Sequence, residues 1–245
     1  LPVFDPTDGF IIAGIFLALS LIPVVFTRRS QPAPPQTDTV SPLRLFEIAP
    51  SAAGAVFVAG AVNTGLLTFL PIWAEALDPA VSAGAAASVL ALVYLASMLT
   101  QWPAGEISDR FDRRLVIAAL AGLAALAALA LAVVTAPGLW VGALLAGAWG
   151  GASLAYYGVA VAHAADRSRV EELPAIASGL LLVWAAGSVI GPVLAGLAWA
   201  GPLGARGLFL FAAAFSALLC AGMVFRRRAR APVDEAEREP FVYLS

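Results

Sequence analysis

Residues 102–114 read WPAGEISDRFDRR and hold three acidic residues and three arginines in thirteen positions. In the whole chain of 245 residues only 12% are charged and 61% are hydrophobic, with a mean hydropathy of +0.89. Apolar runs lie on both sides of the charged stretch, and each is long enough to cross a bilayer, which takes about 20 residues. The chain is therefore expected to be an integral membrane protein. Its spanning elements are expected to be helices, because lipid does not tolerate an open strand edge.

Seven apolar runs of this kind follow one another along the chain, separated by prolines and short polar clusters. We predict an all-α membrane protein in which each run forms one transmembrane helix. The predicted spans are residues 9–26, 49–75, 80–103, 114–135, 138–164, 174–200 and 205–226.

The arginines alternate between the connections. All 14 basic residues are arginine, and 13 of them follow the first, third, fifth and seventh spans. The connections after the second, fourth and sixth spans together hold one arginine, Arg206. By the positive-inside rule the odd-numbered connections and the C-terminal tail are cytoplasmic. We expect a protein of the plasma membrane, the inner membrane of a bacterium, whose first residue lies outside.

The longest linker is rich in proline and polar residues and separates one span from six. We predict four parts: residues 1–26 as the last helix of a preceding half, 27–48 as a cytoplasmic linker, 49–226 as a six-helix half and 227–245 as a cytoplasmic tail. A first residue on the outer side of the membrane, without a signal peptide, is expected when an odd number of spans precedes the chain. We therefore interpret the sequence as a piece of a longer protein.

Anchoring of a loop in the cytoplasm explains the arginines of residues 102–114, but it does not explain Gly105, or Asp109 four residues before Arg113. The stretch GEISDRFDRR resembles the signature G-x-x-x-D-R-x-G-R-R of the major facilitator superfamily, found between the second and third helices of each half. In that family the acid and the arginine join a charge network that latches the outward-open state. The resemblance implies a cytoplasmic gating motif of Gly105, Asp109, Arg110, Arg113 and Arg114.

One position departs from the signature: Asp112 stands where the family usually has glycine. We expect this to disturb a tight turn and to add a second acid that competes for the arginines. Residues 156–167 and 177–196 also resemble helices of this superfamily. The resemblance implies the sixth to twelfth helices of a twelve-helix transporter, with residues 49–226 as two inverted repeats of three helices.

Polar residues inside the spans are concentrated in the second, third and fifth, where the family model places the central cavity. Polar groups in a membrane are costly unless they face a cavity or a partner helix. Candidate cavity residues are Asn63, Thr64, Thr68, Tyr94, Ser97, Trp149, Ser153, Tyr156 and Tyr157. Packing and hydrogen bonding between helices remain the alternative.

The sixth span carries small residues at helical spacing. Gly187, Gly191 and Gly196 predict close contact with another helix, and Pro192 predicts a bend. His163 lies near the cytoplasmic end of the fifth span, where a pH-sensitive gate and a capping role are both open.

No carboxylate lies in the middle of a span, and the chain has one cysteine and one histidine. We expect no catalytic residue, no metal site and no cofactor, since little remains for nucleophilic or metal chemistry. The predicted function is secondary transport of a small, uncharged or amphipathic solute by alternating access. The expected partners are the bilayer, the solute and the missing N-terminal half. A scaffold or sensor that has lost transport, and a membrane-embedded enzyme, are the alternatives.

Overall fold

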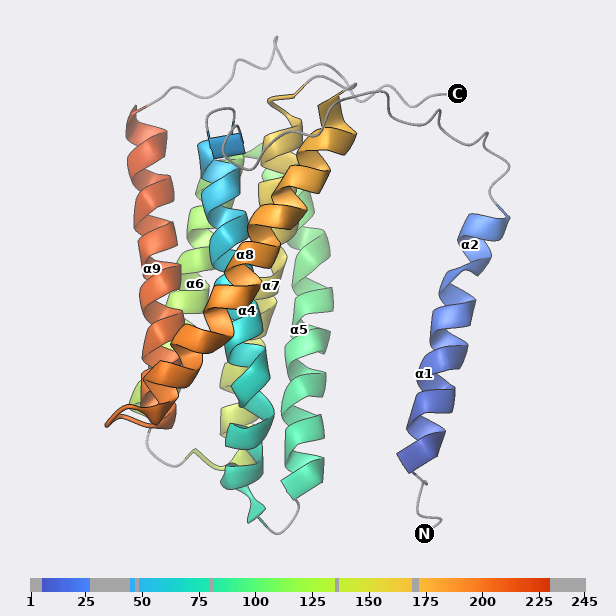
Figure 1. Ribbon diagram of the computed structural model, residues 1–245, viewed down its shortest axis with the longest axis vertical. Coiled ribbons are helices and arrows are strands. Elements are labelled where there is room, and N and C mark those ends of the chain that lie inside the picture. Colours follow the sequence, from blue (N-terminus) through green and yellow to red (C-terminus); the bar gives the residue numbers. More distant parts are fainter. Residues whose placement is uncertain are drawn as a thin grey trace. The chain divides into compact units, whose positions relative to one another are not determined.

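The computed structural model describes residues 6–26, 45–46, 49–79, 82–134, 137–168 and 172–229. The chain divides into two compact units, Leu1–Gln36 and Thr37–Ser245. Every regular element among the described residues is a helix, which confirms the predicted all-α fold (Figure 1). Most of the predicted linker and the predicted tail from Arg230 onward lie outside the described residues.

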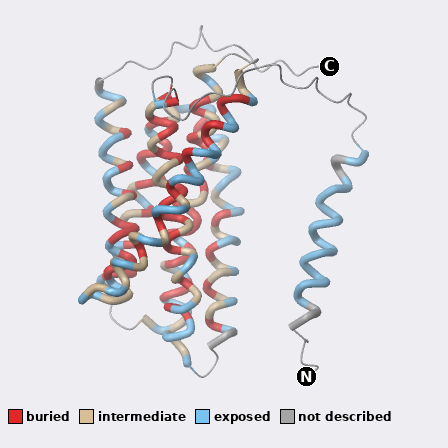
Figure 2. The backbone as a smooth tube through the Cα atoms, viewed as in Figure 1, coloured by how far each residue is buried: buried red, intermediate tan, exposed pale blue. Residues whose placement is uncertain are grey.

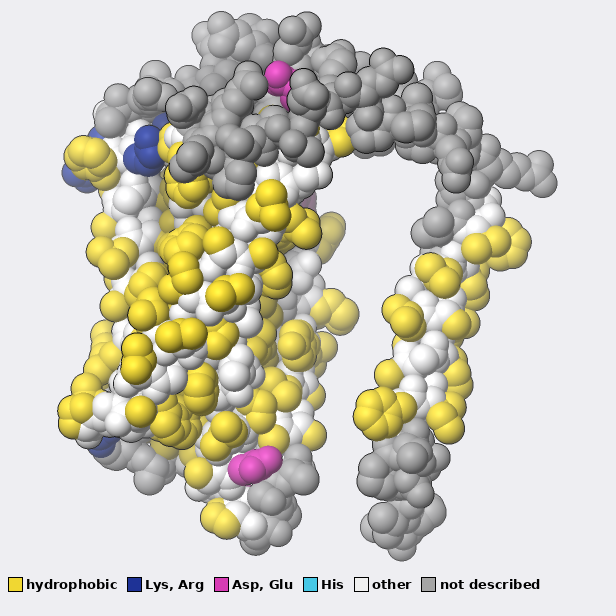
Figure 3. Space-filling model, viewed as in Figure 1, with side chains coloured by type: hydrophobic (Ala, Val, Ile, Leu, Met, Phe, Trp, Pro, Cys, Tyr) yellow, Lys and Arg dark blue, Asp and Glu magenta, His cyan; other side chains and the backbone are white. Residues whose placement is uncertain are grey.

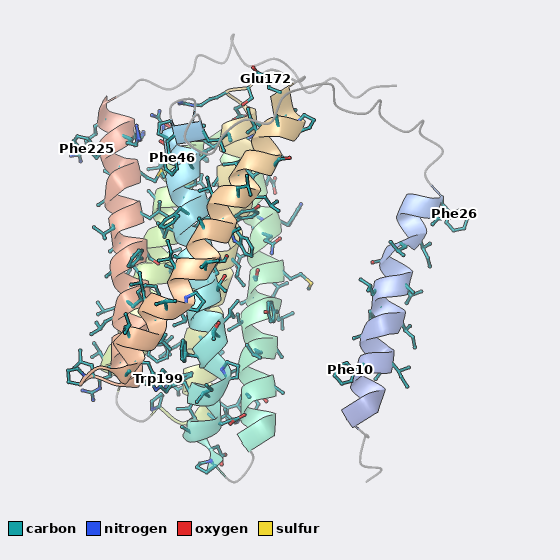
Figure 4. The ribbon with its side chains drawn as sticks, in the orientation of Figure 1. Phe10, Phe26, Phe46, Glu172, Trp199 and Phe225 are labelled. Atoms are coloured by element: carbon teal, nitrogen blue, oxygen red, sulfur yellow. The ribbon has the colours of Figure 1, made fainter. Side chains whose placement is uncertain are left out.

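The first unit contains α1, Pro6–Ser20, and the short helix α2, Ile22–Val25. The sequence predicted one continuous span over residues 9–26, but the helix is interrupted at Leu21, whose N–H donates to the carbonyl of Ala18 at 3.2 Å. Pro23 lacks an amide hydrogen and cannot make the usual bond to the preceding turn. Phe10 and Phe26, at opposite ends of this unit, are exposed (Figure 4).

The second unit contains six long helices. They are α4, Pro50–Leu77; α5, Ser82–Arg110; α6, Arg113–Val133; α7, Leu139–Ala165; α8, Leu173–Ala200; and α9, Ala205–Ala229. Within the described part of the chain, these six helices are long and apolar enough to cross a membrane. Hydrophobic side chains cover the visible sides of the bundle, as expected where lipid is the solvent (Figure 3).

The third predicted span ends later than the sequence indicated. We predicted its end at residue 103, whereas α5 continues to Arg110, so most of the charged stretch is helical. An ion pair between Glu106 and Arg110, one turn apart, stabilises the added turns. The connection to α6 shrinks to Phe111 and Asp112, which makes the start of α6 follow closely on the end of α5.

Consecutive helices run in opposite directions, so α5, α7 and α9 end where α4, α6 and α8 begin (Figure 1). We call this the arginine-rich end, because Arg110, Arg113 and Arg226 lie there. Glu172 and Phe225 mark the same end in Figure 4, and Trp199 lies at the opposite one.

Helix α4 packs mainly on α8, α7 on α5, and α6 on α9. This pattern is preserved when α4–α6 are exchanged with α7–α9, as two repeats of three helices require. The buried residues of α4 and α7 form much of the interior, whereas α5 and α8 are the least buried of the long helices (Figure 2). Among the described residues of the second unit, one face of α5 and one face of α8 are therefore left without a protein neighbour.

Candidate functional site

Arg113, the first residue of α6, joins three elements at the arginine-rich end. Its Nε atom lies 2.5 Å from Oδ2 of Asp166, just after α7, and its Nη1 donates to the hydroxyl of Ser108 on α5 at 2.9 Å. Its Nη2 lies 3.0 Å from Oδ1 of Asp109. The Arg113 side chain is only 15% exposed, so these contacts are partly shielded from water. The guanidinium thus ties the α5–α6 connection to the end of α7.

Of the other two residues of the expected gating motif on α5, Gly105 contacts this cluster through its carbonyl, which accepts from the hydroxyl of Ser108 at 2.9 Å, and Arg110 lies apart from it. Arg110 pairs with Glu106 on its own helix, and both side chains are exposed. Gly105 has open space where a Cβ would stand, so within the described residues no helix packs closely against it. Gly105 instead lines a cavity, described below.

Arg114 points the other way, toward α9. Its Nη1 donates to the carbonyl of Arg226 at 3.2 Å, and its side chain is 3% exposed. The carboxylate of Asp112 accepts hydrogen bonds from the backbone N–H of Arg114 at 2.9 Å and from its Nη2 at 3.0 Å. Burial of the Asp112 carboxyl raises its pKa, but the hydrogen bonds and charge of Arg114 outweigh this, so the net pKa is lowered.

Asp112 therefore behaves only in part as the sequence indicated. We expected it to disturb a tight turn, but its backbone, with φ −57° and ψ 116°, is in a region open to any residue. We also expected it to compete for the arginines of the motif, and it does bind one of them, Arg114, while it caps the start of α6. Arg113 is left to Asp109 and Asp166.

Two adjoining cavities open on the side of the second unit. The larger, about 510 Å³, lies between α5 and α7. Its lining includes Tyr94, Ser97, Gln101, Gly105, Asp109 and Arg113. The smaller, about 350 Å³, lies between α4, α7 and α8, and its lining includes Asn63, Thr64 and Trp184. Leu154 and Tyr157 of α7 belong to both cavities.

Three of the candidate cavity residues on α7 lie inside the bundle instead. Trp149, Ser153 and Tyr156 are fully buried in the interior and line neither of these two cavities. The hydroxyl of Ser153 donates to Oδ1 of Asn63 on α4, and the amide of Asn63 donates back to the carbonyl of Ser153 at 3.4 Å. This reciprocal pair is a contact between helices, the alternative reading of these polar residues.

The remaining candidates on α4 lie near α8. Thr64 donates to the hydroxyl of Ser188 at 3.0 Å, whereas Thr68 is exposed and donates to the carbonyl of Thr64 on its own helix. Thr68 lines neither cavity.

The predicted small residues of α8 lie against α4, and their packing is very close. A Cβ at Gly187 would stand 2.3 Å from the carbonyl oxygen of Phe57, and one at Gly191 would stand 2.1 Å from that of Ala61. Gly196 instead faces the ring of Phe69. Helix α8 continues through Pro192 without a break.

Sequence reasoning missed several residues that contact the candidates. Ser108 and Asp166 bind Arg113, Gln101 donates to the hydroxyl of Ser97 at 2.9 Å, and Ser188 binds Thr64. Ser108 and Gln101 share the helical spacing of Tyr94 and Ser97 once α5 is extended to Arg110. Asp166 lies 53 residues from Arg113, and no local pattern indicates that pair.

Comparison with known proteins agrees with this arrangement. Residues 52–243 match the family model described as Major Facilitator Superfamily. An uncharacterized MFS-type transporter, YcaD, from Escherichia coli strain K12 / DH10B is 26% identical over 185 residues, which cover 74% of this chain and 46% of that protein. The YcaD protein of Salmonella newport strain SL254 is 26% identical over 201 residues, 80% of this chain and 49% of that protein.

No solved structure matches the chain. The chain spans about half the length of the curated relatives that it matches. The family model covers well over half of the chain, including all of α5 to α9, the two cavities and the Arg113 cluster. This integral membrane protein belongs to the major facilitator superfamily.

Proposed function

We propose that the chain is the C-terminal part of a secondary active transporter, which moves a small solute by alternating access between two halves. The observation that carries the proposal is the meeting of two partly polar cavities at Leu154 and Tyr157 of α7. The larger cavity is lined in part by α5 and the smaller in part by α8, the two least buried of the six long helices. A cavity wall of this kind needs a second half opposite it, which we propose the preceding spans provide.

The chemistry of the walls favours an uncharged or amphipathic solute. The hydroxyl and amide groups of Tyr94, Gln101 and Tyr157 offer hydrogen bonds, and Trp184 and Leu154 offer apolar surface. Among the described residues, the charged side chains on the walls of these two cavities are Asp109 and Arg113, which pair with each other at one end. A solute without net charge avoids the cost of an unpaired charge at this depth.

We further propose that the Arg113 cluster is the cytoplasmic gate. It forms one end of the larger cavity and links α5, α6 and α7 through Ser108, Asp109 and Asp166. Movement of α5 relative to α7 would have to break these bonds. Such a cluster favours one of the two states without blocking the other, because a partly shielded ion pair contributes only a modest free energy.

The side of the membrane follows from the arginines. Since 13 of 14 arginines lie in alternate connections and the tail, we place the arginine-rich end in the cytoplasm and the protein in the inner membrane of a bacterium. Residues 27–48 would then be the cytoplasmic linker between the halves, and residues 1–26 would end the first half. The matched segment covers only 46% and 49% of the length of these two relatives, which supports this division.

The test is transport in proteoliposomes. The chain, extended upstream through the five preceding spans that we propose, is reconstituted and offered a panel of labelled uncharged and amphipathic solutes, with and without a proton gradient. Uptake is expected for at least one solute and should fall strongly in Tyr157→Ala, because this residue lines both cavities. Thr68→Ala is the matched control, since Thr68 lines neither.

Two results would contradict the proposal. Uptake by the 245-residue chain alone would mean that one half suffices. Silence across the whole panel, with folded protein and an intact membrane seal, would favour a scaffold or sensor instead.

A further inference from the structure

Two neighbouring arginines at the start of α6 take opposite directions. Arg113 binds Asp166 beside α7, and Arg114 binds the carbonyl of Arg226 in α9. Either arginine could pair with the same acidic residues, so a structural feature must determine which acid each arginine contacts. Asp112 directly precedes Arg113 and lies three residues after Asp109, so the two groups of charges are neighbours in the chain.

We propose that Asp112 is a positioning residue that holds Arg114 against the end of α9 and so reserves Arg113 for Asp109 and Asp166. We call the contact of Asp112, Arg114 and the carbonyl of Arg226 the α6–α9 clamp. The clamp itself is independent of transport, whereas its consequence for the gate rests on the proposed function.

The geometry of the carboxylate supports this role. Oδ1 of Asp112 accepts from both the backbone N–H and the Nε of Arg114, at 2.9 and 3.2 Å, and Oδ2 accepts from Nη2 at 3.0 Å. Two bonds to the guanidinium fix its direction as well as its charge. The Asp112 side chain is only 13% exposed and that of Arg114 only 3%, so water has limited access to either group.

The other end of Arg114 stabilises α9. The last four carbonyls of a helix have no partner within the helix. Arg226 is among the last four residues of α9, and its carbonyl receives Nη1 of Arg114. A cation at this position also complements the negative end of the helix dipole. Arg227, whose Nε lies 4.0 Å from Oδ2 of Asp112, adds a weaker contact because it is half exposed.

The backbone explains why an acid is useful at a position where the family has glycine. At φ −57° the residue gains nothing from the freedom of glycine. A glycine would keep the turn but lose both the cap on α6 and the partner of a buried guanidinium. Arg114, released from Asp112, would then compete with Arg113 for Asp166, the acid already used by the gate.

The clamp is tested with the native Cys220 as a reporter. This cysteine of α9 faces α6, since its Sγ lies 3.5 Å from where a Cβ on Gly122 would stand. Cys220 is six residues from Arg226, roughly 9 Å along the helix. The rate of alkylation by N-ethylmaleimide therefore reports how tightly α6 and α9 are joined near the clamp.

Asp112→Asn is the main variant, because asparagine can still cap α6 while the charge and the second strong acceptor are lost. We expect alkylation of Cys220 in the 245-residue chain to rise by about threefold or more, as the contact opens locally more often. Glu106→Gln is the matched control: it also removes one acid paired to an arginine near this end, but outside the clamp, and should leave the rate unchanged. An unchanged rate in Asp112→Asn would overturn the clamp.

Arg114→Met serves if Asp112→Asn does not fold. It replaces the guanidinium by an apolar side chain and keeps Asp112 as the cap, and it should also speed alkylation.

The positioning role is tested by transport in the extended protein. Asp112→Asn is expected to slow uptake, and the double variant Asp112→Asn/Arg114→Met is expected to recover it, because the competing cation has gone. Failure of the double variant to recover, or a further loss, would contradict positioning and leave only a structural clamp. If no variant and no wild-type protein transports, the proposed function fails, while the alkylation result still decides the clamp.

Discussion

The contact of α4 with α8 and that of α7 with α5 are equivalent contacts between the two three-helix repeats, yet they are built differently. Between α4 and α8 glycines come from both helices: Gly60 and Gly65 face α8, and Gly187 and Gly191 face α4. Between α7 and α5 the described glycines that face the partner helix are on α7: Gly147, Gly150 and Gly151. A Cβ on the glycines of the first contact would stand 2.1–3.0 Å from the nearest backbone atom of the facing helix, whereas in the second contact this distance is 3.1–3.3 Å.

This difference indicates which of the two helix contacts leaves space for a cavity. The larger cavity lies between α5 and α7, and the side chains that α5 places there are polar. At the α4–α8 contact the glycines leave no space, and the smaller cavity lies beside it. Since both contacts join the two repeats in lipid, where close packing drives helix association, the wider backbone spacing of the α5–α7 contact needs a functional reason.

The largest expected effect is on the free energy of unfolding, when a glycine in the α4–α8 contact is compared with a glycine on the wall of the larger cavity. In Gly191→Ala the new Cβ would lie 2.1 Å from the carbonyl oxygen of Ala61, so one backbone must shift. We expect a loss of about 2–3 kcal/mol in the free energy of unfolding. In Gly158→Ala, the same change on α7, nothing lies within 4 Å. There we expect no loss, or a gain of about 0.5 kcal/mol from helix propensity.

Thermal and denaturant unfolding in detergent micelles measure both variants. Equal losses in the two would mean that the α4–α8 contact is no tighter than the cavity wall.

A smaller effect is expected at the polar contact between α4 and α7. Asn63→Ala and Ser153→Ala each leave the other partner of a buried pair unsatisfied, so each should cost about 1–2 kcal/mol in unfolding free energy. The double variant should cost clearly less than the sum of the two, because both remove one interaction. Thr68→Ala, on the exposed side of α4, is the control and should change little. Additive losses would place Asn63 and Ser153 in separate interactions.

The sequence predicted the helices more completely than it predicted the contacts of the candidate site. Six of the seven spans are confirmed within a few residues, apart from the end of α5, because length and apolarity alone decide them. The first differs, since α1 ends at Ser20 near Pro23. The late end of α5 was missed because charged residues were taken to end a span, whereas a helix continues beyond the membrane when pairs such as Glu106 and Arg110 stabilise it.

Side-chain direction was harder to predict. The stripe of Trp149, Ser153 and Tyr156 has the right spacing for one face of α7, and the sequence cannot say whether that face meets a cavity or another helix. The burial of all three depends on packing with other helices, including α4, whose Asn63 lies 90 residues from Ser153. Tyr157, one position further, lies on the cavity wall. Asp112 and Arg114 are only two residues apart, so their pairing could be expected from the sequence. The contact of Arg114 with the carbonyl of Arg226, 112 residues away, could not.

The smallest effect on stability is expected when the pH is lowered, and it distinguishes the carboxylate of Asp112 from the other carboxylates. Since the pKa of Asp112 is lowered on folding, its carboxylate stabilises the folded state above the pKa of the unfolded chain, which for aspartate is about 3.9. That contribution is lost as the pH falls through the lower pKa of the folded state. The melting temperature of the wild type should therefore fall between about pH 5 and pH 3 by about 2 °C more than that of Asp112→Asn, which has no such proton to gain. Thermal melts in detergent at half-unit pH steps measure the difference between the two curves. Parallel curves over this range would mean that the bond from Asp112 to Arg114 adds no charge-dependent stability, and Asp112 would then be only the cap of α6.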